Sequence, residues 1–459
     1  MTQTLPKPDM IHMVGIGGIG MSGIAQILLR SGYRVSGSDF KTNEETEKLK
    51  ALGCHLYTGH QATNLSSQVR TVVYSSAISQ NNVELLEAKR RNINILSRAD
   101  MLAELMRKKR SIVVAGSHGK TTTSAMITTM LMQSGYDPTS IIGGRLKSIA
   151  GNARIGSDEW FVAESDESDG SFVKLLPTIG VVTNIDREHM NHYGTYAKLE
   201  QAFVEFCEHI PFDGQIIICA DNAGSKTLIK LLDRKIVTYG TGDKVHLRAT
   251  DIQLSFQGAS YSVVDRSSGF LGEVNLKVTG THNVLNSLAA VSVGLFLNIP
   301  LDRIAKGLGE YEGISRRLEY KGRSKNGCLI YDDYAHHPSE IRASLEALRV
   351  IAKDKPIHVI FQPHRYSRFG DLWTDFLESF EGVRSLYVLP VFTAHESEIP
   401  GITSEAFVEQ IKKHRHIRAQ LSTSFDDALE AIKACAKKDD IVVCMGAGDI
   451  TKIAAELVQ

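Results

Sequence analysis

The chain has 459 residues with 52 basic and 52 acidic side chains, so its formal net charge at pH 7 is zero. This balance gives no general attraction to nucleic acid or to an anionic membrane, and we expect neither as a partner. The length predicts about three domains, at roughly 100 to 200 residues each. The sequence lacks an apolar run of about 18 residues, and Met1–Asp9 is polar where a secretory leader is apolar, so we expect a cytosolic protein.

The first predicted strand leads into a glycine-rich turn. The apolar run Ile11–Val14 precedes Gly15-Ile-Gly17-Gly18-Ile-Gly20, and a helical pattern continues to Arg30 before a second strand around Val35. Glycines let the backbone approach a diphosphate, and the amides of the following helix attract its charge. With Asp39 ending the second strand, the spacing is typical of a dinucleotide fingerprint. A nucleotide site is predicted, and a nicotinamide (NAD-dependent) dehydrogenase is one interpretation.

A second phosphate loop follows a domain break near residue 109. The stretch Met101–Arg110 is helical in pattern and ends in four basic residues, which suits a helix C-terminus. The strand Ser111–Ala115 then leads into Gly116-Ser-His-Gly-Lys-Thr-Thr-Thr123 and a helix over Ser124–Met132. This is a shortened P-loop, with two residues between its glycines instead of four. Its lysine can neutralise triphosphate charge and its threonine can bind Mg²⁺, which a dehydrogenase does not need.

Two acidic segments follow neighbouring predicted strands. Trp160–Ala163 delivers Glu164 and the acids after it, while Ile179–Thr183 leads into a second acidic turn that contains His189. Each turn alone has a plain interpretation as a solvated loop. Because the carboxyl ends of parallel strands meet at one edge of a sheet, the pair beside a P-loop predicts a Mg²⁺ site instead.

The remaining segments complete a three-domain α/β prediction. Residues 240–280 alternate apolar and polar and predict a few antiparallel strands appended to the middle domain, before a helix from Thr281 to Phe296. A second break near residue 315 precedes strands at Cys328, Ile357, Leu386 and Ile441. We therefore predict domains over residues 1–108, 109–315 and 316–459, with parallel sheets. The six cysteines, none in a C-x-x-C pair, are expected to be buried free thiols.

Nine blocks together resemble the Mur ligases, in family order along all three segments. They are GIGGIGMSGIA (15–25), GSHGKTTT (116–123), ESDESD (164–169), NIDREHM (184–190), THN (281–283), Arg316-Arg317, DDYAHHP (332–338), QPHRYSR (362–368) and MGAGDI (445–450). The resemblance implies a Rossmann-like UDP-sugar domain, a central P-loop ATPase and a Rossmann-like domain that closes over an amino acid. The sequence is similar to the branch of the family that joins L-alanine to UDP-N-acetylmuramate in peptidoglycan synthesis. The resemblance implies ATP and Mg²⁺ as cofactors and a monomer or weak homodimer.

The resemblance also implies roles for individual residues. The metal ligands would be Thr121, Glu164 and His189, and the catalytic residues Lys120, His336, Arg365 and Arg368. The ATP site would comprise Gly116, Ser117, His118, Gly119, Lys120, Thr121, Thr122, His282, Asn283, Arg317 and Asp333. The UDP-sugar site would comprise Gly15, Gly17, Gly18, Gly20, Ser22, Asp39, Ser75 and Ser76, and the amino-acid site Tyr334, His336, Arg365 and Arg368.

The sequence departs from the family pattern at three positions, with Ser117 for threonine, Ser165 for alanine and Glu188 for aspartate. The departure at Glu188 would shift His189 slightly. A recycling ligase that attaches a tripeptide to the same sugar acid stays an alternative, which the first glycine loop and the QPHRYSR block disfavour. A non-catalytic nucleotide sensor is a further alternative, against which the intact Lys120, Glu164 and His189 argue. The histidines before Pro338 also have a plain interpretation as turn residues.

Overall fold

The computed structural model describes residues 10–394, 396–414 and 417–458. The stretch 1–9, on which the expectation of no secretory leader rests, lies outside the described residues. The described chain forms two compact units. The first covers the chain up to Thr250 with Tyr261–Asn275 and Leu285–Glu312, and the second covers Asp251–Ser260, Leu276–Val284 and the chain from Gly313 onward. No helix in the described ranges is long and apolar enough to cross a membrane.

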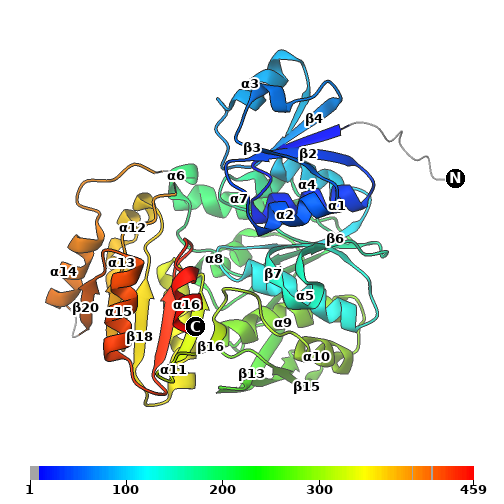
Figure 1. Ribbon diagram of the computed structural model, residues 1–459. Coiled ribbons are helices and arrows are strands. Elements are labelled where there is room, and N and C mark those ends of the chain that lie inside the picture. Colours follow the sequence, from blue (N-terminus) through cyan, green and yellow to red (C-terminus); the bar gives the residue numbers. More distant parts are fainter. Residues whose placement is uncertain (1–9, 395, 415–416, 459) are drawn as a thin grey trace. The chain divides into compact units, whose positions relative to one another are not determined.

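The first unit begins with a parallel sheet in the order β3-β2-β1-β4-β5 (Figure 1). Its strands are β1 (Met10–Val14), β2 (Arg34–Asp39), β3 (His55–Thr58), β4 (Val69–Tyr74) and β5 (Asn94–Ser97). Its helices are α1 (Ile19–Arg30), α2 (Glu44–Ala51), α3 (Val83–Arg90) and α4 (Arg98–Met106), with the short turn η1 (Ala62–Asn64). The strand order reverses between β1 and β4, and ligands bind at such a switch point in open α/β sheets.

A ten-stranded sheet makes up most of the rest of the first unit, in the order β15-β14-β13-β12-β11-β10-β6-β9-β7-β8, and parts of β13, β14, β15 and α9 belong to the second unit. Its strands are β6 (Arg110–Ala115), β7 (Thr139–Leu146), β8 (Gly151–Arg154), β9 (Trp160–Glu164), β10 (Ile179–Val182), β11 (Gln215–Cys219), β12 (Ile236–Gly240), β13 (Leu247–Ser255), β14 (Gly258–Asp265) and β15 (Gly269–Leu276). Its helices are α5 (Lys120–Gln133), α6 (Met190–Tyr193), α7 (Tyr196–Glu208), α8 (Ala223–Leu231), α9 (Thr281–Phe296) and α10 (Leu301–Gly309), with η2 (Lys147–Ile149) and η3 (Ser171–Lys174). The adjacent strands β10, β6 and β9 are parallel, so the loops that follow them lie at one edge.

The second unit carries a six-stranded sheet in the order β16-β17-β21-β18-β19-β20. Its strands are β16 (Glu319–Arg323), β17 (Leu329–Asp333), β18 (Ile357–Phe361), β19 (Ser385–Val388), β20 (Arg418–Leu421) and β21 (Ile441–Met445), and only β16 runs antiparallel to its neighbour. Its helices are α11 (Pro338–Ala352), α12 (Tyr366–Asp371), α13 (Trp373–Ser379), α14 (Ser404–His414), α15 (Phe425–Cys435) and α16 (Thr451–Val458). Three sheets, each with its own helices, confirm the predicted three-domain α/β architecture.

Most predicted elements are present, and one helix was placed wrongly. The helix expected over Met101–Arg110 is α4, which begins at Arg98 and ends before the basic run. A capping box between Ser97 and Asp100 starts the helix earlier than expected. Arg110 is instead the first residue of β6, where it pairs with Trp160 of β9. The alternating residues of 240–280 form β13, β14 and β15. Turns of two and three residues connect these neighbouring strands, and connections this short join antiparallel strands. All six cysteines are free thiols, five buried and Cys435 half-buried, as predicted.

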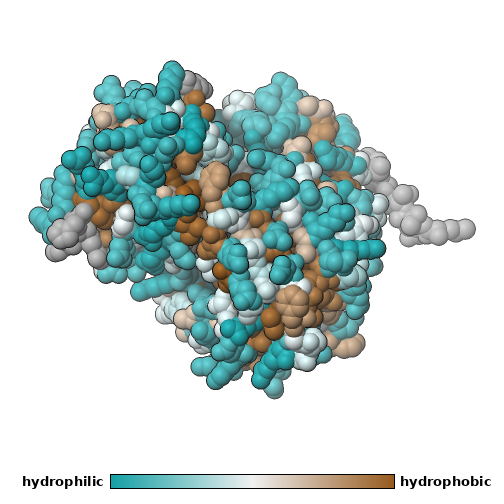
Figure 2. All heavy atoms as spheres, turned by 90° about the horizontal axis from the view of Figure 1, so that it is seen from below, coloured by the Kyte–Doolittle hydropathy of each residue, from teal (hydrophilic) through white to brown (hydrophobic). Residues whose placement is uncertain are grey.

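Colouring by hydropathy shows hydrophilic and hydrophobic residues interspersed on the surface (Figure 2). The face in view carries hydrophilic residues over most of its area, with apolar side chains in the recesses between them. The buried apolar side chains lie on the faces of the sheets. The central strand β6 is buried from Ser111 to Ala115. Burial on both faces explains why this strand has a continuous apolar sequence without alternation.

Candidate functional site

The loop after β6 needs glycine at both of its glycine positions. Gly116 has φ +130° and Gly119 has φ +81°, a backbone region that other residues rarely adopt. A Cβ atom on Gly116 would lie 2.2 Å from Thr183 Oγ1, and one on Gly119 would lie 2.6 Å from Asn286 Oδ1. Gly119 caps α5 and Lys120 is the first helical residue. The loop therefore ends at a helix N-terminus, whose amides and dipole attract phosphate.

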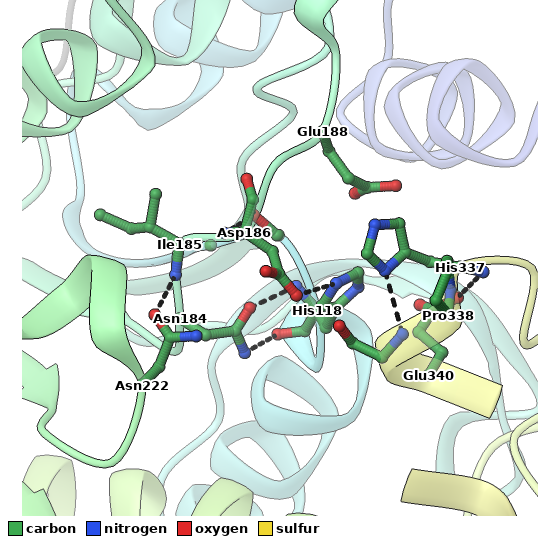
Figure 3. Close-up of polar contacts among 12 residues, drawn as sticks. His118, Asn184, Ile185, Asp186, Glu188, Asn222, His337, Pro338 and Glu340 are labelled. Carbon is green, nitrogen blue, oxygen red and sulfur yellow. Dashed lines mark hydrogen bonds and ion pairs between the residues drawn. The ribbon is translucent and has the colours of Figure 1, made fainter. Parts of the chain in front are cut away.

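The segment that follows β10 holds this loop in place through paired hydrogen bonds (Figure 3). The amide of His118 donates to Asn184 Oδ1 at 2.9 Å, and Asn184 Nδ2 donates back to the His118 carbonyl at 3.0 Å. The Asp186 amide donates to Ser117 Oγ at 2.8 Å, and the Asp186 carboxylate lies 3.2 Å from His118 Nε2. Asn222 in turn accepts from the Ile185 amide at 3.1 Å. The predicted residues Ser117 and His118 are thus fixed by Asn184 and Asp186, which the prediction omitted.

Lys120 is held by its own loop and by an acid of the segment after β9. Its ammonium donates to the carbonyls of Gly116 and Ser117 and to Glu167 Oε1 at 2.7 Å. Burial alone lowers the pKa of Lys120, but the Glu167 carboxylate outweighs it and the net pKa is raised, so the lysine is charged. Burial raises the pKa of Glu167 to about 7, although Lys120 opposes the shift. These contacts hold the Lys120 ammonium at the loop. The oxygens of a bound phosphate can replace the carbonyl and carboxylate oxygens as its partners.

The predicted metal ligands fall into two groups. Thr121 Oγ1 donates to Glu164 Oε2 at 2.8 Å, while His189 Nε2 lies 3.8 Å from both Glu167 Oε1 and Glu188 Oε2. Ligand atoms of Glu167, Glu188 and His189 all lie within 4.8 Å of one another. Glu167 Oε2 is buried and has no hydrogen-bond partner among the residues that the structure describes, and such an oxygen fits a divalent cation.

His189 adopts φ +57° and is the N-cap of the short helix α6. The prediction named His189 but not Glu167 or Glu188 as metal ligands. Their place in the two acidic blocks beside the P-loop was the sequence feature that pointed to them.

Gly143 on β7 was absent from the predicted site. A Cβ atom there would lie 1.7 Å from Glu164 Oε1 and 2.6 Å from Glu164 Cδ. No side chain is compatible with the observed position of the Glu164 carboxylate. Gly143 is therefore glycine because Glu164 occupies the space, and its backbone φ is not the reason.

The first glycine loop is bound to the end of β2. Gly15 has φ +78°, and the Gly17 amide donates to Asp39 Oδ2 at 2.8 Å. Gly18 is the N-cap of α1, so this loop also ends at a helix N-terminus. Ser75 follows β4 and lies beside Gly15, where a Cβ would be 3.2 Å from the Ser75 Cβ. The neighbouring Ser76 is exposed. The first glycine loop and the two serines therefore follow β1 and β4, at the switch point between these strands.

Two residues of the predicted UDP-sugar set face other parts of the protein. The Ser22 side chain is fully buried, donates to the Ile19 carbonyl at 3.0 Å and lies 3.2 Å from Asn152 Nδ2 of β8. Its hydroxyl thus joins α1 to the ten-stranded sheet. Gly20 lies against the guanidinium of Arg98.

In the second unit, the loop after β17 presents an aromatic and a histidine. The Tyr334 ring lies between two guanidinium groups, with Arg316 at 4.9 Å and Arg317 at 5.0 Å from its centroid. The Tyr334 carbonyl accepts a hydrogen bond from His336 Nδ1 at 2.9 Å, and Glu340 Oε2 lies 3.1 Å from the same nitrogen. An imidazole with its single hydrogen on Nδ1 has its lone pair on Nε2.

His337 has a different position, as the N-cap of α11 (Figure 3). Its Nδ1 accepts from the Ser339 amide at 3.2 Å, and Glu340 completes the capping box. The plain interpretation as a turn residue fits His337. The neighbouring His336 instead contacts the Tyr334 carbonyl.

Two arginines follow β18 in the same unit. Arg368 Nη1 donates to His364 Nδ1 at 3.2 Å, and burial together with the cations nearby lowers the pKa of His364 to about 3. A neutral His364 lies between the His336 ring at 5.7 Å and the Phe392 ring at 5.4 Å. Arg365 has φ +68°, and within the described part of the chain its buried Nε has no hydrogen-bond partner. This concentration of positive charge suits a carboxylate.

The predicted nucleotide contacts of the second unit lie near Arg317. Burial, with the Arg317 charge, lowers the pKa of His282 to about 4, so this histidine is neutral. Asn283 Nδ2 donates to the Thr279 carbonyl at 2.8 Å. Burial raises the pKa of Asp333 to about 6, while Arg317 opposes the shift. Arg317 itself lies 3.6 Å from Glu340 Oε1.

The fold and the loop after β6 define a multidomain α/β protein with a phosphate-binding loop. Three family descriptions match in succession, namely "Mur ligase family, catalytic domain" over residues 10–110, "Mur ligase middle domain" over 114–294 and "Mur ligase, glutamate ligase domain" over 316–448. The chain belongs to the Mur ligase family.

Individual relatives are similar over almost the whole chain. The UDP-N-acetylmuramate–L-alanine ligase of Desulfatibacillum aliphaticivorans is 44% identical, covering 97% of each chain. The enzyme of the same name from Solibacter usitatus is 42% identical over 99% of this chain and 95% of its own. Among solved structures, the UDP-N-acetylmuramate–alanine ligase of Thermotoga maritima matches with TM-score 0.83 and 27% identity over 98% of both chains. A murein peptide ligase from Psychrobacter arcticus, at 22% identity and TM-score 0.73, shares the fold.

Proposed function

We propose that the protein is an ADP-forming ligase that joins L-alanine to the carboxylate of UDP-N-acetylmuramate, the first amino-acid addition in peptidoglycan precursor synthesis. The observation that carries the proposal is the 44% identity to a ligase of that name over 97% of each chain. The phosphate loop, with a charged Lys120 at the start of α5, supports it. The tripeptide-recycling and dehydrogenase alternatives are disfavoured, because the curated relatives cited carry the alanine-ligase name.

In the first step, the sugar-acid carboxylate attacks the γ-phosphate of ATP and yields an acyl phosphate and ADP. Lys120 exchanges Glu167 and the loop carbonyls for phosphate oxygens and stabilises the charge that develops on them. Thr121 and Glu164 would hold one Mg²⁺, and His189 a second one, with Glu167 and Glu188 close to His189. When bound, Mg²⁺ supplies charge neutralisation along the phosphates.

In the second step, the neutral amine of L-alanine attacks the acyl carbon, and phosphate leaves as the amide forms. Arg365 and Arg368 are the proposed anchors of the alanine carboxylate, because a guanidinium binds a carboxylate through two parallel hydrogen bonds. The Nε2 atom of His336 is the proposed proton acceptor, since Nδ1 already donates to a carbonyl. Tyr334 positions this histidine through that carbonyl.

The proposal assigns one ligand to each predicted domain. Residues 1–108 would bind the UDP-sugar, 109–315 ATP, and 316–459 the amino acid, with His282, Asn283, Arg317 and Asp333 contacting the nucleotide. We further propose a cytoplasmic protein, because the reaction consumes ATP, and a monomer or weak homodimer.

The test is an ADP-release assay with UDP-N-acetylmuramate, ATP and Mg²⁺, to which each amino acid or the tripeptide is added in turn. L-Alanine should give the highest kcat/KM. Higher turnover with the tripeptide would favour the recycling ligase, and no ADP release with any amine would refute ligase activity.

A further inference from the structure

Arg98 is a half-buried cation that the proposed reaction has not used. It is the first residue of α4, directly after β5, and its side chain is 17% exposed. The carboxyl ends of β1, β4 and β5 share one edge of the first sheet, so Arg98 and the first glycine loop lie at the same edge.

The guanidinium of Arg98 lies against the first turn of α1. A Cβ atom on Gly20 would be 3.2 Å from Arg98 Nη1, 3.4 Å from Cδ and 3.8 Å from Cζ. Gly20 therefore leaves the space in which the guanidinium packs. This is the N-terminus of the helix that the glycine loop opens, where an anion is already favoured.

The same guanidinium is tied to the acidic segment of the ATP-binding sheet. Arg98 Nη2 donates to Asp166 Oδ2 at 2.8 Å. This ion pair joins the first residue of α4 to the segment that follows β9, and the Asp166 side chain is 36% exposed.

Most donors of Arg98 are still available to a ligand. Of the residues that the structure describes, Asp166 alone accepts a hydrogen bond from this side chain, whereas a guanidinium has five N–H groups. Its position fits an anion with several oxygens at the start of α1.

We infer that Arg98 is a substrate-positioning residue that binds the diphosphate of the UDP-sugar, and that Asp166 holds it in place beside the first glycine loop. The inference rests on the proposed function, because it takes the UDP-sugar as the ligand. It adds a charged side chain to a site that the glycine loop alone would build from backbone amides. It also explains Gly20, which makes room for the guanidinium.

The experiment compares binding of UDP and of uridine to the full-length protein without ATP, by calorimetry for UDP and ligand-observed NMR for uridine. R98A should weaken UDP binding by about 10- to 100-fold, the range for one lost hydrogen bond to a charged group. Binding of uridine, which has no phosphate, should be unchanged. R98K should give an intermediate loss for UDP, because lysine keeps the charge but lacks the two parallel N–H groups of the guanidinium. G20A should cause a milder loss with the same pattern, since its methyl group would lie 3.2 Å from Arg98 Nη1 and shift the guanidinium slightly.

R107A is the matched control, because Arg107 follows the same helix and its side chain is 73% exposed. It should bind UDP like the wild type. Equal UDP affinity in R98A and the wild type, or equal losses for UDP and uridine, would overturn the inference. A wild-type protein that binds no UDP would count against the proposed function instead.

Discussion

Replacing Gly143 by alanine should disable the ATP-dependent step without unfolding the protein. The added methyl group would lie 1.7 Å from Glu164 Oε1, so the carboxylate has to move. Moving it breaks the 2.8 Å hydrogen bond from Thr121 Oγ1, which links the first turn of α5 to β9. The displaced carboxylate also leaves its proposed place beside Mg²⁺, and the loss of one charged interaction, about 1.5–3 kcal/mol, should lower kcat/KM for ATP by roughly 10- to 150-fold.

The assay is ADP release at varied ATP and Mg²⁺ concentrations, with a thermal unfolding curve for each variant. G151A is the matched control on the neighbouring strand β8, because the nearest atom to its added methyl group is 3.9 Å away. E164A and the double variant G143A/E164A should be equally stable and equally inactive, since the methyl group then occupies the space left by the carboxylate. G143A activity within threefold of the wild type would refute this explanation.

Three further predictions follow from the remaining geometry. H336Q should lower kcat about 100-fold, whereas H337N should keep both the α11 cap and near-normal activity, as measured by steady-state kinetics; equal losses would contradict the roles given to the two histidines. R365K should raise KM for L-alanine about tenfold with less change in kcat, and an unchanged KM would remove Arg365 from the carboxylate site. E84Q should destabilise the protein by about 3 kcal/mol at pH 7, because hydrogen bonds at the buried Glu84 outweigh its desolvation and lower its pKa from 4.5 to about 2. That contribution is present above about pH 4.5 and disappears as the pH falls towards 2, so the gap between the urea midpoints of E84Q and the wild type should stay constant from pH 7 to pH 5 and narrow by roughly half by about pH 3; a constant gap down to about pH 3 would contradict it.

The elements nearest the glycine-rich loops could be predicted because local sequence determines them. Buried parallel strands such as Ser111–Ala115 have continuous apolar runs, and the glycines that follow are needed for positive φ or close approach. The helix α4 was misplaced, since a capping box at Ser97 outweighed the basic run taken for its end.

The rest of the site depends on contacts between residues that are distant in sequence. Gly143 has to be glycine because of Glu164, 21 positions further on, and β7 itself has no alternating pattern that marks it as a strand. The pairing of His118 with Asn184 and of Arg98 with Asp166 likewise arises only when strands become neighbours. Ser22 was carried over from the family pattern, yet its hydroxyl joins α1 to β8.

The position of the ATP triphosphate tests the central claim most directly. The measurement is a crystal structure of the protein with a nonhydrolysable ATP analogue and Mn²⁺, whose anomalous scattering locates the metal. We predict the γ-phosphate within hydrogen-bond distance of Lys120 Nζ, and Mn²⁺ bound by Glu164 and Thr121. An analogue bound only at Gly15–Gly20, with no metal near Glu164, would contradict the assignment of the second loop and with it the proposed ligase reaction.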